Sequence, residues 1–173
     1  MDGKRLTHLD DEGRLKMVDI GDKECTARVA RVRGEICIQP TTAALIAQNR
    51  VAKGNVIEAA RLAGIMAAKR TGDLIPLCHP LNITAVDIDF TLKSDRVQVE
   101  AQVRIDDRTG VEMEALTAAT IALLTIYDMC KGVDKDMVIS EVRLMEKRGG
   151  QSGVYQRTCL LYTSDAADEG HGV

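Results

Sequence analysis

The sequence contains no tryptophan and a single phenylalanine, and aromatic residues make up only 2% of its 173 residues. Proteins that bind single-stranded nucleic acids stack the bases on aromatic side chains, and those that bind duplexes present a basic surface. Few aromatic residues and a formal net charge of −3 disfavour both classes. We therefore expect a protein that does not act on nucleic acid.

Long hydrophobic runs are also missing. No uninterrupted apolar stretch reaches the length needed to cross a membrane, and residues 1–8 are too polar for the apolar segment of a signal peptide. The five cysteines form no Cys-x-x-Cys pair and their number is odd, which favours reduced thiols over a disulfide framework or a zinc knuckle. These features predict a cytoplasmic location and no contact with a membrane.

The C-terminal stretch does not read as part of a fold. Residues 159–169 resemble the in-frame translation of a transposase sequencing adapter, and a natural Ala/Asp-rich tail is the alternative. We divide the chain into an N-terminal segment (1–24) with a short strand at 16–20, a single domain (25–157) and a tail (158–173). The tail is expected to be disordered and is excluded from the prediction of the fold.

Apolar periodicity predicts the elements of the domain. Alternation of apolar and polar residues predicts strands at 25–38, 86–92, 97–105 and 137–145. Apolar residues at helical spacing predict helices at 41–48, 55–69 and 109–131. This is the β-α-β-β-α-β order of the ferredoxin-like sandwich, an α+β fold with an antiparallel sheet and helices on one face.

Local signals predict where two helices begin and one ends. Asn55 and Thr109 each precede a glutamate by three residues, the pattern of a capping box. Gly132 suits the left-handed position that commonly follows a helix. The second capping box would explain Glu112 without any functional role.

A loop with two prolines contains a candidate binding residue. His79 lies next to Cys78, between Pro76 and Pro80, and ordered loops on a rigid scaffold commonly form sites. No second histidine or cysteine lies at a metal-ligand spacing, so no metal site is expected here. A packed loop with a hydrogen-bonded imidazole is the alternative.

Charged residues at both ends of the apolar helix 109–131 need an explanation. Glu114 and Asp128 are fourteen residues apart, so they lie within about 40° of one helical face but about 21 Å apart along the axis. One small ligand cannot reach both within a single chain. If both serve a site, that site is assembled from two copies. Glu114 paired with a surface cation is the alternative.

Asp128 and Lys131 are neighbours on the helix surface. An aspartate in a last helical turn lies at the unfavourable end of the helix dipole, and apolar neighbours are expected to raise its pKa. An acid and an amine at one place suit proton transfer. An ordinary ion pair explains the same spacing.

Two segments resemble phosphate sites. Lys53 and Gly54 precede a helix N-terminus, which attracts anions, and residues 147–153 (Lys-Arg-Gly-Gly-Gln-Ser-Gly) combine cations with glycines that can form an anion-binding nest. Neither is a Walker sequence. Each could equally be a solvated basic loop.

Several sequence strings occur together and in order: Lys53-Gly54, 60–71, 74–80 (Leu-Ile-Pro-Leu-Cys-His-Pro), 109–117 (Thr-Gly-Val-Glu-Met-Glu-Ala-Leu-Thr), 127–131 (Tyr-Asp-Met-Cys-Lys) and 135–138. With them the chain resembles the cyclic pyranopterin monophosphate synthase family (molybdenum cofactor biosynthesis protein C) over about residues 6–153.

The resemblance implies a ferredoxin-like subunit in a homohexamer, a trimer of dimers with active sites at the dimer interface. It implies a lyase of molybdopterin biosynthesis that converts (8S)-3′,8-cyclo-7,8-dihydroguanosine 5′-triphosphate to cyclic pyranopterin monophosphate and diphosphate. A radical SAM GTP cyclase would supply this substrate. No organic cofactor is implied, and the presence of Mg²⁺ with the triphosphate is left open.

The same resemblance implies roles for ten residues. Those implied to be catalytic are Asp128, Lys131 and Lys53. Those implied to bind substrate are Leu77, Cys78, His79, Met113, Glu114, Arg28 and Lys147. The chain departs from the family pattern at Gln151, where a lysine is usual, and at Asn55, where an aspartate is frequent.

Two functions of other classes remain open. A nucleotide-sensing module would bind at a subunit interface without catalysis, and it would lose affinity on Asp128→Ala. A structural scaffold would not bind a nucleotide at all. The acid, the amines and the histidine favour an enzyme.

Overall fold

The computed structural model describes residues 8–10, 12–151 and 153–158. Its elements in chain order are β1 (Thr26–Cys37), α1 (Pro40–Ala47), α2 (Val56–Ala68), α3 (Thr71–Leu74), β2 (Ala85–Leu92), β3 (Arg96–Asp107), α4 (Glu112–Cys130), β4 (Val138–Arg148) and β5 (Tyr155–Gln156). The adapter-like stretch 159–169 lies outside the described residues.

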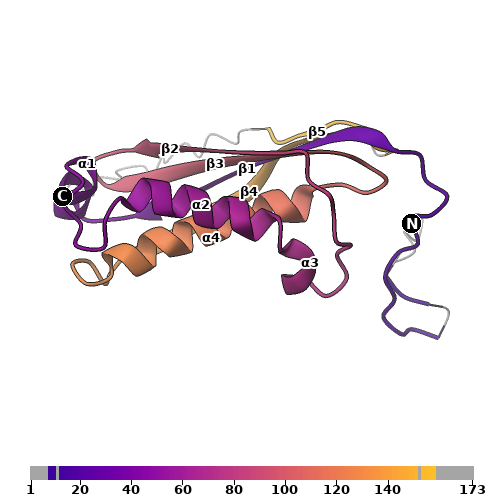
Figure 1. The fold of residues 1–173 in the computed structure, drawn as a ribbon, viewed down its shortest axis with the longest axis horizontal. Helices are drawn as coiled ribbons and strands as arrows, with labels where there is room; N and C mark the ends of the chain where they lie inside the picture. Colours follow the sequence, from indigo (N-terminus) through magenta and orange to yellow (C-terminus); the bar gives the residue numbers. More distant parts are fainter. Residues whose placement is uncertain (1–7, 11, 152, 159–173) are drawn as a thin grey trace, which may run out of the picture.

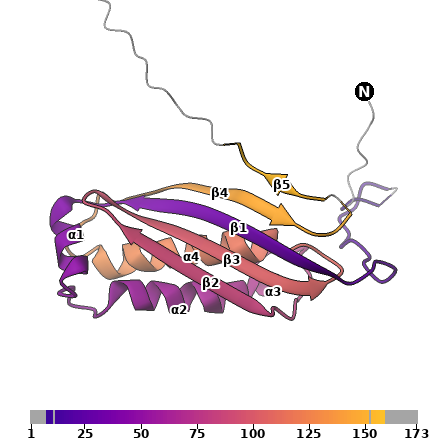
Figure 2. The ribbon, with the colours of Figure 1, turned by 90° about the horizontal axis from the view of Figure 1, so that it is seen from above.

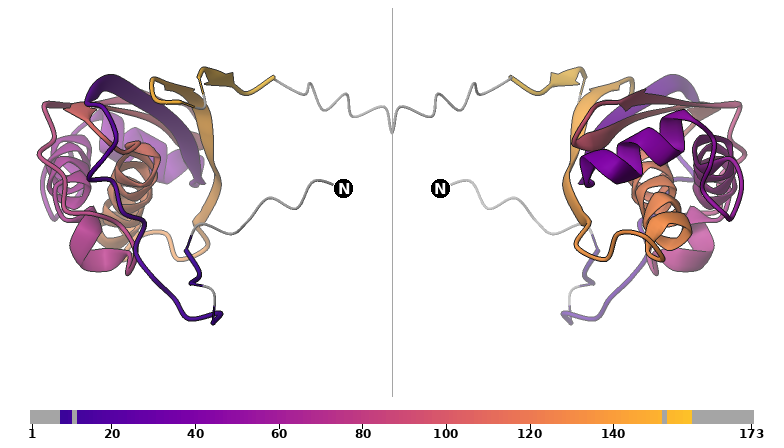
Figure 3. Two further views of the ribbon diagram at one scale, coloured as in Figure 1. Left: turned by 90° about the vertical axis from the view of Figure 1, so that its right-hand side faces the viewer. Right: turned by 90° about the vertical axis from the view of Figure 1, so that its left-hand side faces the viewer.

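The strands form one antiparallel sheet in the order β2-β3-β1-β4-β5 (Figure 2). Helices α2 and α4 lie side by side on one face of this sheet, and α1 lies at one end of the molecule (Figures 1 and 3). The first four strands have the order and directions of a ferredoxin-like sandwich, so the predicted α+β fold is confirmed. β5 is a short addition that pairs with β4.

Strand alternation separates a core face from a charged face, because successive side chains point to opposite sides of a sheet. The core-facing residues of β1 and β3 are almost fully buried: Ala30, Val32, Ile36, Val97, Val99, Ala101, Val103 and Ile105. The opposite face carries ion pairs, among them Arg31 with Glu100 and Glu146. One face therefore packs against the helices while the other remains polar.

α4 is the central helix of the core. Its buried residues include Ala115, Ala118, Ala122 and Leu123, which pack between the sheet and α2. Within the described residues, α4 is the one helix whose length and hydropathy would also fit a membrane span. The burial of its side chains against the sheet and α2 explains this composition by packing in the protein core.

Three predictions made from local sequence are wrong: one concerns a strand, and two concern the ends of α4. Residues 16–20 form no strand, and the segment before β1 makes only an isolated bridge between Leu9 and Leu15. α4 begins at Glu112, and Val111 precedes it with no side-chain cap. Val111 is almost fully buried, so packing determines the start of α4. α4 ends at Cys130, its C-cap residue Lys131 has a right-handed conformation, and Gly132 does not adopt a positive φ.

The N-cap of α2 is confirmed, since the Asn55 side chain accepts a hydrogen bond from the backbone N–H of Glu58 at 3.1 Å. All four cysteines of the described part of the chain (Cys25, Cys37, Cys78 and Cys130) are free thiols.

Gly64 allows α2 to approach α4 closely. A Cβ atom there would lie 2.9 Å from the Ala118 carbonyl oxygen and 2.5 Å from Ile88 Cδ1. We expect Gly64→Ala to lower the free energy of unfolding by about 1–3 kcal/mol through overpacking, despite the better helix propensity of alanine. Urea unfolding of the purified variant measures this. Gly132→Ala is the control, because no atom lies within 4 Å of its Cβ position. Equal stability of both variants would contradict the close approach.

Candidate active site

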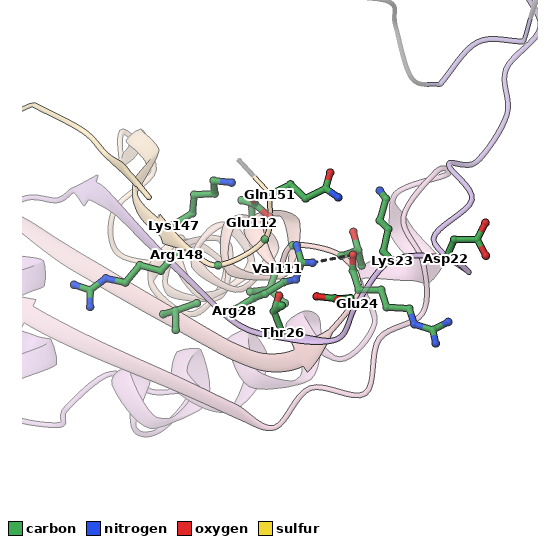
Figure 4. Close-up of a pocket in the computed structure, with 16 residues that line it drawn as sticks. Asp22, Lys23, Glu24, Thr26, Arg28, Val111, Glu112, Lys147, Arg148 and Gln151 are labelled. Atoms are coloured by element: carbon green, nitrogen blue, oxygen red, sulfur yellow. Dashed lines mark hydrogen bonds between the residues drawn. The ribbon is translucent and has the colours of Figure 1, made fainter. Parts of the chain in front are cut away.

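Two adjoining cavities lie at the end of the sheet where α4 begins. The larger, about 730 Å³, is lined by the segment before β1, the start of β1, the β3–α4 loop and the end of β4 (Figure 4). The smaller, about 290 Å³, is lined by the N-terminal segment, the loop after α3 and the first turn of α4. Both are lined by Lys23, Thr109, Gly110 and Glu112, so they form one continuous depression.

Cations line the larger cavity. Arg28 of β1 and Lys147 of β4 both point to the helix side of the sheet, because each is directly opposite a core-facing position. Figure 4 shows Lys147 and Gln151 on the β4 side of the cavity and Lys23 on the side of the segment before β1. Arg148 points away from the cavity and pairs with Glu146. The predicted phosphate residues Arg28 and Lys147 are therefore brought together.

The Arg28 side chain is fixed by backbone groups. Its Nε donates to the Asp107 carbonyl at 2.9 Å and its Nη2 to the Arg108 carbonyl at 3.0 Å. These bonds hold the guanidinium beside the β3–α4 loop, with other N–H groups left for an anion.

The turn after β4 passes directly over Arg28. Gly149 and Gly150 both have a positive φ, of 91° and 74°. A Cβ atom at Gly149 would lie 2.2 Å from the Ala27 carbonyl oxygen, and one at Gly150 would lie 2.4 Å from Arg28 Nη1. Only glycine suits this close approach, and Gly149 and Gly150 both line the larger cavity.

The smaller cavity brings together five predicted substrate residues: Leu77, Cys78, His79, Met113 and Glu114. The third wall of this cavity was not predicted from the sequence, and it consists of His8, Val18, Ile20 and Lys23. No motif indicated these residues. The nearest signal was that His8 and His79 are the two histidines before the adapter-like stretch.

Glu114 is the most unusual group in this cavity. Its residue is only 3% exposed. Burial, with a further contribution from the nearby charge of Glu112, raises the pKa of Glu114 to about 7. The alternative that Glu114 pairs with a surface cation is wrong, because the residue is buried and the described residues form no ion pair with it. Burial, aided by Glu114, also raises the pKa of the Cys78 thiol.

The raised pKa of Glu114 predicts a pH dependence of stability. Between pH 4.5 and 7 the folded state keeps a proton on Glu114 that the unfolded state has released, so stability falls as pH rises. We expect wild type to lose about 2–3 kcal/mol relative to Glu114→Gln across this range. Urea unfolding at several pH values measures the difference. Glu58→Gln, at an exposed position on α2, is the control. If the difference in stability between Glu114→Gln and wild type is the same at every pH, the raised pKa of Glu114 is contradicted.

Lys53, Asp128 and Lys131 form a separate group, called here the Lys–Asp–Lys cluster. Asp128 Oδ1 contacts Lys131 Nζ at 2.7 Å, and Oδ2 contacts Lys53 Nζ at 2.9 Å. Lys53 also donates to the Asp128 backbone carbonyl at 2.8 Å, at the end of α4 where carbonyls lack helical partners. The sequence predicted each member, and the structure brings them into contact.

The electrostatics of this cluster differ from the prediction. Hydrogen bonds from Lys131 and then Lys53 lower the pKa of Asp128 to about 2. Asp128 in turn raises the pKa of Lys131. The expected upward shift of the Asp128 pKa is wrong because its side chain is 56% exposed and two ammonium groups lie beside it. Asp128 and Lys131 are therefore both charged near neutral pH.

The cavities and the Lys–Asp–Lys cluster lie at opposite ends of α4. Glu114 is in its first turn and Asp128 in its last, about 21 Å away along the axis. The residues of the cluster line neither cavity. Within the described part of the chain, no three His, Cys, Asp or Glu side chains are grouped so that they could hold a metal ion.

The fold and this geometry define a class: a small ferredoxin-like α+β protein with a cation-lined, glycine-walled pocket suited to a phosphorylated ligand. The family model described as "MoaC family" matches residues 17–150. Cyclic pyranopterin monophosphate synthase of Pelotomaculum thermopropionicum is 56% identical over 154 residues, which cover 88% of this chain and 91% of that protein. The synthases of Chloroflexus aurantiacus (57% identity; 88% and 94% covered) and Parvibaculum lavamentivorans (54%; 90% and 99%) are similarly close. The chain belongs to the MoaC family.

Proposed function

We propose that this chain is a cyclic pyranopterin monophosphate synthase, a lyase of molybdenum cofactor biosynthesis. Its substrate would be (8S)-3′,8-cyclo-7,8-dihydroguanosine 5′-triphosphate, and its products cyclic pyranopterin monophosphate and diphosphate. Support comes from relatives of that name, more than half identical over most of both chains. The observation that carries the proposal is the continuous depression, in which a basic compartment adjoins a compartment lined by a buried carboxyl group.

The two compartments suit the two halves of such a substrate. The triphosphate would lie in the larger cavity, where Arg28 and Lys147 offset its charge. The guanine-derived ring would lie in the smaller cavity, against Leu77, Cys78, His79 and Met113. Glu114 would face the ring nitrogens. A carboxyl group with a pKa near 7 can either accept or donate a proton there.

The reaction needs proton transfer and charge stabilisation. The purine ring opens, a pterin ring closes, and a sugar hydroxyl attacks the α-phosphorus as diphosphate leaves. The attacking hydroxyl loses its proton as the new O–P bond forms. Charge that develops on the leaving diphosphate would be stabilised by Lys53, Arg28 and Lys147.

Asp128 would act as the base once the cluster meets the substrate. In the free chain both lysines keep the Asp128 carboxylate ionised and its pKa near 2. Phosphate oxygens that attract either ammonium group weaken this stabilisation, and the pKa of Asp128 then rises. Asp128 and Lys131 would therefore titrate as a coupled pair during turnover.

One active site would be shared by two protomers. A distance of about 21 Å along α4 separates Glu114 from Asp128, so one substrate reaches both groups only if they come from different chains. We propose a homohexamer built as a trimer of dimers, in which the cavities of one protomer meet the Lys–Asp–Lys cluster of its partner. We further propose a cytoplasmic location, no required cofactor, and substrate supply by a radical SAM GTP cyclase.

Turnover of the purified cyclised nucleotide tests the proposed function. Release of diphosphate and formation of cyclic pyranopterin monophosphate are expected for the full chain and for a chain ending at residue 157. Binding of the nucleotide without release of diphosphate would instead indicate a sensing module. Absence of binding in equilibrium dialysis would indicate a scaffold.

A further inference from the structure

Asp134 is a buried carboxylate that the proposed reaction does not use. Its residue is 2% exposed. Its Oδ2 accepts hydrogen bonds from the Gln39 backbone N–H at 2.8 Å and from Thr42 Oγ1 at 3.1 Å. Its Oδ1 is also buried and has no hydrogen-bond partner within the described residues. Burial of an incompletely satisfied carboxylate costs stability, so stability alone does not explain this residue.

Asp134 closes the turn that follows Lys131. The backbone N–H groups of Val133 and Asp134 both donate to the Cys130 carbonyl, at 2.9 and 3.0 Å. The Tyr127 hydroxyl donates to the Lys135 carbonyl at 3.3 Å. These bonds shape the turn, and the side chain of Asp134 then attaches it to the start of α1.

The other end of α1 leads to the second lysine of the cluster. α1 ends at Ala47, and buried Val51 anchors the short connection to Lys53. Lys53 then contacts Asp128. The hydrogen bonds of Asp134 thus join the two chain segments that deliver Lys131 and Lys53 to the same carboxylate.

We propose that Asp134 is the positioning residue of the Lys–Asp–Lys cluster: it holds the turn 131–134 against α1 so that both ammonium groups stay in contact with Asp128. The structural part of this inference is independent of the reaction. Its catalytic consequence rests on the proposed function.

Two substitutions distinguish the hydrogen bonds of Asp134 with Gln39 and Thr42, called here the tether, from its carboxyl group as such. Both hydrogen bonds go to one oxygen, which the amide oxygen of Asp134→Asn can replace, whereas Asp134→Ala removes the tether. In ¹³C NMR titration of the substrate-free protein, we expect the Asp128 pKa to rise in Asp134→Ala and to stay near 2 in Asp134→Asn. In turnover assays we expect Asp134→Ala to lower kcat at least about tenfold with little change in KM, and Asp134→Asn to restore it.

Loss of a buried polar group elsewhere provides the control. Thr71 is 1% exposed and donates to the Ala67 and Ala68 carbonyls near the other end of α2. Thr71→Ala should lower stability without moving the pKa of Asp128. If Asp134→Ala does not fold, Thr42→Val removes one of the two donors and should raise the Asp128 pKa by a smaller amount.

An Asp128 pKa that is unchanged in folded Asp134→Ala, or one that rises equally in Asp134→Asn, would overturn the proposal. The titration requires no substrate, so it can refute the positioning role of Asp134 even if turnover supports the proposed function. An inactive wild-type chain would refute the proposed function and leave the titration to decide the tether.

Discussion

Asp128→Asn is expected to lower kcat by about a thousandfold while KM changes only a few-fold, because a positioned acid or base commonly contributes 10²–10⁴ to a rate. Asparagine has the shape of aspartate, but its one amide oxygen can replace only one of the two carboxylate oxygens that accept from Lys53 and Lys131. It cannot accept the proton of the attacking hydroxyl or offset two ammonium charges. Binding should therefore survive while diphosphate release stops.

The matched control is Asp89→Asn, which removes an exposed carboxylate from β2 on the opposite face of the sheet. Its turnover should equal that of wild type. Wild-type turnover by Asp128→Asn would refute the catalytic role of Asp128. If the affinity of Asp128→Asn for the nucleotide in equilibrium dialysis falls as much as its activity, a sensing module is favoured.

Arg28→Ala is expected to lower kcat/KM by about 10²–10³, mainly through KM, since hydrogen bonds to charged groups are among the strongest single contacts in a site. The substitution removes a guanidinium from the larger cavity and also removes the two bonds to the Asp107 and Arg108 carbonyls. Arg28→Lys should fall between Arg28→Ala and wild type, because it keeps the charge but not the forked geometry.

Arg33→Ala is the control for Arg28→Ala. Arg33 is on the same strand but on the outer face, where it pairs with Glu100 at 2.9 Å. Steady-state kinetics of Arg28→Ala, Arg28→Lys and Arg33→Ala test whether Arg28 binds the triphosphate. A KM for Arg28→Ala equal to that of Arg33→Ala would place the triphosphate elsewhere.

The sequence predicted the sheet well because alternation reports burial directly. In β3, Val97, Val99, Ala101, Val103 and Ile105 are all buried as their spacing indicated. The Asn55 cap was also predictable, since its hydrogen bond to Glu58 is local in sequence. The sequence strings 77–79 and 113–114, to which the family resemblance assigned substrate contacts, lie together in the smaller cavity.

Features that depend on distant residues were not predictable. The start of α4 depends on the burial of Val111 in the core, which overrides the local capping pattern at Thr109. The low pKa of Asp128 comes first from its neighbour Lys131 and then from Lys53, and Lys53 lies 75 residues earlier in the chain. The predicted strand at 16–20 failed because alternation shows which residues could form a strand and does not show whether a neighbouring strand is available to pair with.

Mixing Asp128→Asn with Arg28→Ala, assayed at a substrate concentration well below the KM of Arg28→Ala, where each variant alone turns over slowly, tests the shared site most directly. Asp128→Asn carries an intact cavity, and Arg28→Ala carries an intact Lys–Asp–Lys cluster. If each site takes its cavity from one protomer and its cluster from the partner, random re-pairing of equal amounts leaves about a quarter of the sites without either substitution. The account predicts recovery to about a quarter of wild-type turnover after the chains are mixed, unfolded and refolded together. Turnover that stays at the average of the two separate variants would contradict a site shared between protomers.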